Sequence, residues 1–154
     1  MHRRPLTAGE IALSRNIFGG AIDYSKVELI RRKWWPLQPV NYVMTPSGNL
    51  HFHPNSYLWS DDFSDNSRFA DLFIHEMTHV WQAQRRGRFY LPLMRHPFCR
   101  YLYAVRPGQR FEEYGLEQQA EIVRHIFQLR RGVIVEGAPA LAQLESILPG
   151  EWRR

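Results

Sequence analysis

The pattern of hydrophobic and polar positions predicts a first helix within residues 6–20. Thr7 and Glu10 have the spacing of a capping box, in which each side chain accepts a hydrogen bond from the backbone N–H of the other residue. Gly19 follows the last apolar position and supplies the end of the helix. The helix is therefore expected to begin just after Thr7 and to end before Gly19.

Two longer amphipathic stretches follow. Residues 68–86 carry a broad apolar face and precede Gly87, and residues 111–132 carry a second apolar stripe that ends at Gly132. The proline-rich and aromatic stretch between them predicts a loop. A short closing helix is expected within residues 138–150.

Strand patterns occur in the first third of the chain. Residues 24–35 alternate apolar with polar positions, and residues 40–54 predict a hairpin around the turn at residues 46–49. Both precede the helix at residues 68–86. The sequence therefore predicts an α+β fold that is mainly helical, with a small β-sheet or hairpin in front of the first long helix.

Length and composition narrow the class of protein. The chain has 154 residues, of which 44% are hydrophobic, so we expect one domain over residues 1–154. No apolar run approaches the roughly 20 residues of a membrane-spanning helix. The N-terminus lacks the pattern of a signal peptide. These features predict a protein that is cytoplasmic as synthesised, and they also fit export by a contractile secretion system.

The formal net charge of +5 favours an anionic partner. None of the basic clusters has the spacing of a recognised nucleic-acid motif, so nucleic acid is not the expected partner. Trp34 and Trp35 stand beside a basic triplet, an arrangement that would suit an anionic or sugar-like substrate. Because most tryptophans of a small domain lie in its core, we expect the five here to be mainly buried.

The stretch FIHEMTHVWQ contains the pattern His-Glu-x-x-His. Residues four apart lie on one face of a helix, so His75 and His79 can present imidazole nitrogens to a single metal ion. Glu76 points to the side of that pair and can reach a metal-bound water without binding the metal. Two helical histidines can also be ordinary satisfied residues. The mid-helix position favours a zinc site with an adjacent catalytic base.

Such a site needs a third protein ligand, and the second long helix offers Glu117 and Glu121 one turn apart. One could bind Zn²⁺ while the other accepts a hydrogen bond from a ligand imidazole. Both could instead be solvated acids on the helix surface. Spacing alone does not decide which carboxylate would touch the metal.

HEMTH followed by EQQAE resembles the gluzincin pattern of zinc metallopeptidases. More narrowly, the chain resembles the zincin-like Vgr-related proteins, which are associated with type VI secretion spikes. The stretches that carry this resemblance are LTAGEIALSRNIFGGAIDYSKV, FHPNSYLWSDDFS, FIHEMTHVWQAQRRG and YGLEQQAEIV. It implies a zincin-like fold and a role as, or beside, a secreted antibacterial effector with a spike protein as partner.

The resemblance also implies site roles. Zn²⁺ would be bound by His75, His79 and Glu117, with Glu76 as catalytic base. The gluzincin helix usually has Asp where this chain has Glu121, which we assign to hydrogen-bond a ligand histidine without touching the metal.

The expected reaction is hydrolysis of a peptide or protein substrate. Zinc would polarise the carbonyl and acidify a bound water, and Glu76 would pass the proton of the water to the leaving amine. The developing oxyanion needs a further donor. Five residues in the loop between the two long helices or in the second of them are candidate donors: His96, Tyr101, Tyr103, Tyr114 and His125. Of these we name Tyr114 and His125 as the expected donors.

A catalytically silent adaptor is the alternative function. Its zinc would staple the fold while the basic, aromatic surface docks onto a secretion spike or another partner. A purely structural zinc usually has four protein ligands, so an open fourth position favours catalysis. His96 and Cys99 are spaced for metal binding, but a lone His-x-x-Cys is a weak signal, and Cys99 is expected to be a small buried hydrophobe.

Overall fold

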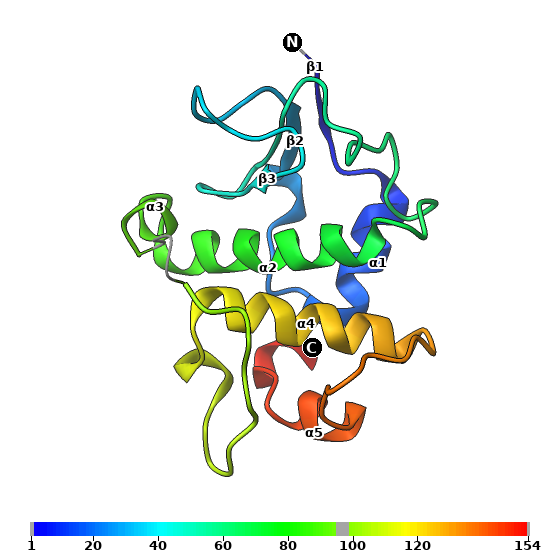
Figure 1. Ribbon diagram of the computed structural model, residues 1–154, viewed down its shortest axis with the longest axis vertical. Helices are drawn as coiled ribbons and strands as arrows, with labels where there is room; N and C mark the ends of the chain where they lie inside the picture. The colour runs from blue at the N-terminus through cyan, green and yellow to red at the C-terminus, as the bar shows by residue number, and fades with distance from the viewer. Residues whose placement is uncertain (1, 95–98, 154) are drawn as a thin grey trace.

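The computed structural model describes residues 2–94 and 99–153 (Figure 1). This part of the chain forms five α-helices and a four-stranded sheet, which confirms the predicted α+β class. The sheet lies on one side of helix α2 (Ala70–Arg86), and α4 (Leu116–Arg130) lies on the other side, with α5 (Leu141–Ser146) beyond it. No helix of the described residues is long and apolar enough to cross a bilayer.

The sheet has the strand order β1-β2-β4-β3, so β3 is an edge strand. Its strands are β1 (His2–Pro5), β2 (Glu28–Arg31), β3 (Val43–Met44) and β4 (Leu50–Phe52). β2 pairs with β1 antiparallel and with β4 in parallel, while β3 and β4 form the antiparallel hairpin that the sequence predicts.

Two strand predictions need correction. The predicted strand at residues 24–35 shrinks to β2, because Tyr24–Lys26 form a 3-10 turn before it. β1 is a strand that the hydrophobic pattern does not predict, because HRRP has no apolar alternation and its residues lie mostly exposed. It is held by backbone pairing with β2 instead.

Helix α1 (Ala8–Phe18) begins and ends where the sequence predicts. Thr7 Oγ1 accepts a hydrogen bond from Glu10 N at 3.0 Å, and Glu10 Oε2 accepts one from Thr7 N at 2.9 Å. The capping box is therefore confirmed. Gly19 follows with a φ of 54°, in the left-handed region that glycine adopts without a steric penalty.

The second long helix begins later than predicted. Tyr114 and Gly115 are extended, with ψ angles of 153° and 159°, so Phe111–Glu113 form a separate 3-10 turn and α4 starts at Leu116. The predicted loop between the long helices contains a short helix, α3 (Tyr90–Met94). Its proline does not break it, because a proline in the first turn of a helix removes no helical hydrogen bond.

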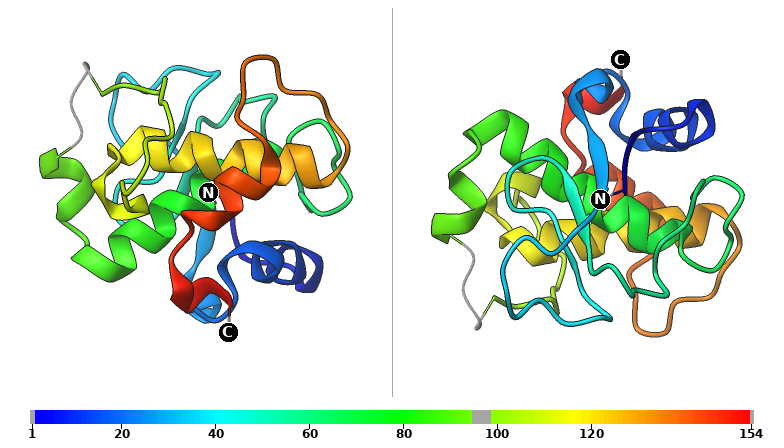
Figure 2. Two further views of the ribbon diagram at one scale, coloured as in Figure 1. Left: turned by 90° about the horizontal axis from the view of Figure 1, so that it is seen from below. Right: turned by 90° about the horizontal axis from the view of Figure 1, so that it is seen from above.

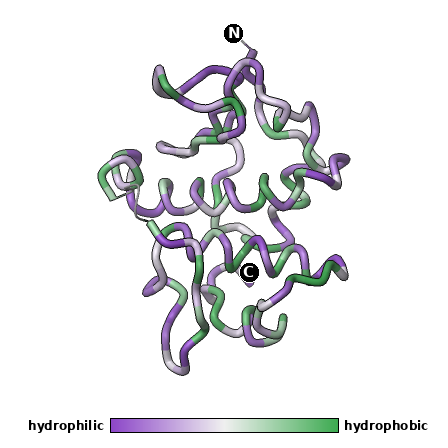
Figure 3. The backbone as a smooth tube through the Cα atoms, viewed as in Figure 1, coloured by the Kyte–Doolittle hydropathy of each residue, from purple (hydrophilic) through white to green (hydrophobic). Residues whose placement is uncertain are grey.

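The core lies between the sheet and helices α1, α2 and α4. Figure 2 shows α4 running alongside α2, and Figure 3 shows hydrophobic residues recurring along both helices. Phe63 stacks on Phe73 at 5.2 Å, and Trp152 near the C-terminus packs against Trp81 at 5.0 Å. Burial of such rings is the main favourable term in folding.

The prediction that the tryptophans lie mainly in the core is wrong for two of them. Trp34 and Trp35 are 44% and 43% exposed. Both lie in the connection between β2 and β3, outside the strands of the sheet.

One buried carboxylate joins three separate segments. Glu10 is fully buried, and its two oxygens accept hydrogen bonds from both terminal nitrogens of Arg4, at 2.8 and 2.9 Å, and from Phe63 N at 3.0 Å. These bonds tie β1 and the loop before α2 to the first turn of α1.

We expect Glu10→Ala to lower the free energy of unfolding by about 3 to 5 kcal/mol, because it leaves Arg4 without its buried charge partner. Urea unfolding followed by circular dichroism measures the change. The matched control is Glu145→Ala, which removes the exposed ion pair with Arg130 and should cost less than about 1 kcal/mol. Equal losses in the two variants would contradict the structural role of Glu10.

Candidate metal centre

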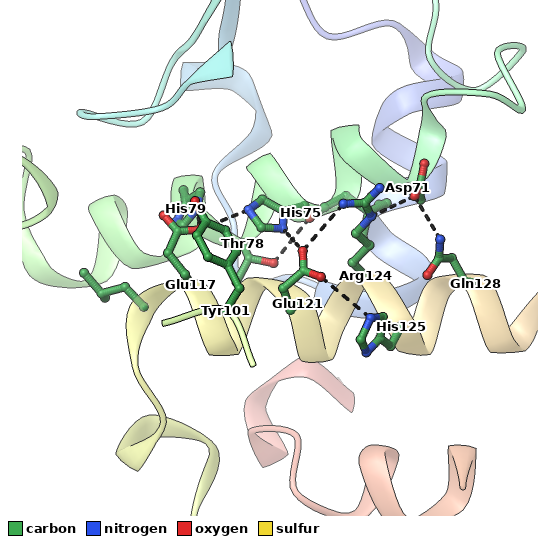
Figure 4. Close-up of polar contacts among 12 residues, drawn as sticks. Asp71, His75, Thr78, His79, Tyr101, Glu117, Glu121, Arg124, His125 and Gln128 are labelled. Atoms are coloured by element: carbon green, nitrogen blue, oxygen red, sulfur yellow. Dashed lines mark hydrogen bonds and ion pairs between the residues drawn. The ribbon is translucent and has the colours of Figure 1, made fainter. Parts of the chain in front are cut away.

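Helices α2 and α4 run antiparallel, and polar side chains pair across them in reverse order. Successive turns of α2 meet successive turns of α4 in the pairs Asp71–Arg124 at 2.7 Å, His75–Glu121 at 2.8 Å and His79–Glu117 at 3.2 Å (Figure 4). This register brings the two predicted histidines opposite the two predicted glutamates.

Three buried side chains converge at the centre of this interface. The Nε2 atoms of His75 and His79 each lie 3.2 Å from the same oxygen, Oε2 of Glu117. One candidate ligand atom from each residue lies within 4.8 Å of the others. This spacing fits one ion bound at about 2 Å by each atom. His75, His79 and Glu117 could therefore hold a metal ion.

Hydrogen bonds orient both imidazoles toward that centre. Nδ1 of His75 lies 2.8 Å from Oε1 of Glu121, and Nδ1 of His79 lies 2.8 Å from Oε1 of Gln82. The amide of Gln82 is fixed, because its Nε2 donates to Gln119 Oε1 at 2.9 Å and to a backbone carbonyl of α4. With Nδ1 as the donor, the lone pairs of the neutral rings lie on Nε2 and face the carboxylate, an arrangement that a cation stabilises.

The electrostatics of the site favour positive charge. Burial by itself opposes a charge on His75, but its hydrogen bonds to Glu117 and Glu121 raise its pKa to about 9. Burial likewise opposes ionisation of Glu121, but the hydrogen bond from His75 and the charge of Arg124 hold its pKa below the usual value. The carboxylates of α4 are thus arranged to stabilise a cation between the helices.

Glu76 lies beside the three convergent residues and has its own partner. Its Oε2 accepts a hydrogen bond of 2.6 Å from the hydroxyl of Thr45, and both side chains are buried. Thr45 directly follows the edge strand β3. Sequence reasoning did not find Thr45, because the contact arises only when the hairpin packs onto α2 and no local pattern indicates it.

A cavity of about 280 Å³ opens next to Glu76 and His75. Its walls include the apolar side chains of Val43, Leu58 and Leu72. The cavity is large enough to admit an amino-acid side chain.

Among the predicted donors that the structure describes, Tyr101 lies against one of the convergent histidines. Its ring lies nearly parallel to the imidazole of His75, with 6.3 Å between centroids, and its hydroxyl lies 3.2 Å from that of Tyr42. Both tyrosines line the cavity.

The two donors expected from the sequence, Tyr114 and His125, form hydrogen bonds away from the cavity. The hydroxyl of Tyr114 accepts a hydrogen bond from Arg106 N at 3.3 Å, and Nδ1 of His125 lies 2.6 Å from the hydroxyl of Tyr103. Neither Tyr114 nor His125 is among the residues that line the cavity. His96 lies outside the described residues, and Cys99 is half-buried, less than predicted.

Comparison with known proteins places the chain in a family. No protein-family profile matches it. It is 38% identical over 131 residues to the type VI secretion system spike protein VgrG2b of Pseudomonas aeruginosa, a match that spans 80% of this chain and 13% of that protein. The solved structure of the effector domain of P. aeruginosa VgrG2b superimposes with a TM-score of 0.72 at 35% identity, covering 93% of this chain and 80% of that one. The chain therefore belongs to the family of the VgrG2b effector domain.

Proposed function

We propose that the protein is a zinc-dependent peptidase that acts as an effector of type VI secretion. The observation that carries this proposal is the convergence of His75, His79 and Glu117 beside a buried Glu76 and an open cavity. Two imidazoles and one carboxylate are a ligand set typical of catalytic zinc sites, which keep a fourth position open. The proposed fold is accordingly zincin-like, with α2 under the edge of a small sheet.

The side chains around the trio have separate tasks in the proposed mechanism. A zinc ion held by the trio would polarise a substrate carbonyl and acidify a water molecule. Glu76 would accept the proton of the attacking water and donate it to the leaving amine. Thr45 holds one oxygen of the Glu76 carboxylate, so the other oxygen remains available for the proton. Glu121 and Gln82 keep the ligand imidazoles in their Nδ1–H form.

The family supports the effector role. The matched region is a small part of a spike protein, and the matched structure is called an effector domain. We infer that this protein, too, is delivered with a secretion spike as its partner and acts on a peptide or protein in the recipient cell. Co-purification of the protein with a spike protein of the same cell tests the partnership.

The catalytically silent adaptor remains the rival function. It shares the metal trio but needs neither the buried Glu76–Thr45 pair nor an adjacent cavity, and both are present here. These two features favour catalysis over a structural role for the metal.

Metal content tests the ligand set. We expect about one zinc per chain in the purified protein, measured by inductively coupled plasma mass spectrometry. His75→Ala and Glu117→Ala should lose most of it, because each removes one of three ligands. His53→Ala, a histidine outside the trio, is the control and should keep its zinc. A wild-type protein that binds no zinc after supplementation would contradict the proposal.

Glu76→Gln tests the catalytic base. We expect it to keep zinc and to lose hydrolysis by roughly 10²- to 10⁴-fold, because glutamine cannot accept the proton. The assay incubates the zinc-loaded protein with a proteome-derived peptide library and identifies new termini by mass spectrometry. A Glu76→Gln variant as active as the wild type would exclude this role. A wild type that leaves the whole library intact would favour the adaptor.

Thr45→Val tests whether Thr45 positions Glu76. The substitution keeps the shape but removes the donor, and a hydrogen bond to a charged group is worth about 1.5 to 3 kcal/mol. We therefore expect kcat to fall about tenfold or more with KM and zinc content little changed. Thr45→Ser, which keeps the hydroxyl, should restore most of the loss. Equal activity of the valine and serine variants would argue against the positioning role.

A further inference from the structure

A segment remote from the metal trio presents an unusual surface. Every residue from 32 to 42 is exposed except Gln38, and we call this segment the aromatic loop. Trp34 and Trp35 are 44% and 43% exposed, and Leu37 is 73% exposed. In Figure 1 the loop lies on the opposite side of α2 from α4 and α5. Large apolar side chains gathered on one exposed loop mark an interaction site more often than chance.

Hydrogen bonds from one buried side chain hold the aromatic loop in a defined conformation. The buried side chain of Gln38 accepts a hydrogen bond from Trp34 N at 2.8 Å and donates to the carbonyls of Tyr42, at 3.0 Å, and His51 in β4, at 2.9 Å. One side chain thus closes the loop and fastens it to the sheet. The tryptophans are held outward in a preformed arrangement, which lowers the entropy cost of binding.

The charge of this region has one sign. Arg31 precedes the aromatic loop, and Arg32 and Lys33 are its first two residues. The chain has no aspartate or glutamate between Glu28 and Asp61. The loop therefore joins exposed aromatic and aliphatic side chains to a local excess of positive charge.

We propose that the aromatic loop is a docking surface for anionic lipid bilayers. Tryptophan and tyrosine favour the interface between headgroups and acyl chains, where the ring is shielded and its polar edge stays wet. Arginine and lysine beside them are attracted to anionic headgroups. Leu37 and Val40 would enter the acyl boundary, adding apolar area that leaves water on binding.

The aliphatic side chains distinguish a bilayer from other anionic partners. A glycan or a nucleic acid could stack on Trp34 and Trp35, but it would gain little from Leu37 and Val40, whose exposed surfaces contain no polar group. A bilayer interface accommodates all four side chains together with the cations.

Docking would also orient the cavity. Tyr42, the last residue of the aromatic loop, lines the 280 Å³ cavity beside His75 and Glu76. A protein bound through the loop would hold the mouth of this cavity close to the lipid surface. The lipid interaction itself requires neither zinc nor hydrolysis, so it stands or falls separately from the proposed peptidase activity.

The experiment is co-sedimentation of the purified full chain with two kinds of vesicle, phosphatidylcholine alone and an equimolar mixture of phosphatidylcholine and phosphatidylglycerol. We expect binding to the mixed vesicles, weakened by salt, and little binding to the neutral ones. Arg32→Gln with Lys33→Gln should weaken binding at least tenfold, since each cation near an anionic surface contributes about fivefold. Trp34→Ala with Trp35→Ala should weaken it at least as much.

A matched control comes from another exposed apolar pair beside arginines. Val133 and Ile134 are 48% and 93% exposed and follow Arg130 and Arg131. Val133→Ala with Ile134→Ala should bind the mixed vesicles like the wild type. Circular dichroism and urea unfolding establish that each variant is folded.

A second readout needs no variant. Brominated phosphatidylcholine in the mixed vesicles should quench part of the tryptophan fluorescence of the wild-type protein, because Trp34 and Trp35 enter the interface. The proposal is overturned by absence of binding to the mixed vesicles, by equal losses in the loop and control variants, or by binding without quenching. Binding to isolated cell-wall sacculi in place of vesicles would overturn it in favour of a glycan partner.

Discussion

Two imidazoles and two carboxylates occupy the interface between α2 and α4, where packing would ordinarily favour apolar side chains. Glu117 is 1% exposed and His79 is equally buried, so their polar atoms cannot rely on water. The antiparallel register places an imidazole opposite a carboxylate at two successive turns, His75 facing Glu121 and His79 facing Glu117. The remaining architecture holds that register, with Arg124 bonded to Asp71 at one end and Gln82 bonded to Gln119 at the other.

This constraint explains why the other elements are arranged around α2. The residue after the edge strand, Thr45, reaches the buried Glu76, and the connection before α4 supplies Tyr101 against His75. The C-terminal turn fixes the far side of α2 through Trp152 and Trp81. Side chains from segments distant in sequence therefore meet α2 on several faces, which preorganises the site before any ligand binds.

The sequence predicts the parts of this arrangement that depend on local geometry. His75, Glu76 and His79 could be placed because the helical period alone sets their relative directions. Spacing alone could not choose between Glu117 and Glu121, since they lie one turn apart on α4 and the register against α2 separates them. The assignment of Glu117 came from the family resemblance instead. The sequence did not predict the contact of Thr45 with Glu76, because it forms only when the hairpin packs onto α2.

Packing also decided the features of the fold that the hydrophobic pattern missed. β1 exists because backbone groups pair with β2, which requires no apolar residue. The exposure of Trp34 and Trp35 follows from Gln38, a polar residue that takes the buried place in their loop. The general preference of tryptophan for the core does not tell which side chain of a particular loop is buried.

The reversed pairing of α2 and α4 also determines how this family can vary in length. One residue inserted within either helix would rotate the part of the helix beyond it by about 100° and turn one of the convergent side chains to another face. Segments outside these helices have no such periodic constraint, so they can lengthen or shorten while the convergent side chains keep their directions. Insertions that preserve the convergence of His75, His79 and Glu117 should therefore lie outside α2 and α4, and the two helices should keep their phase across the family.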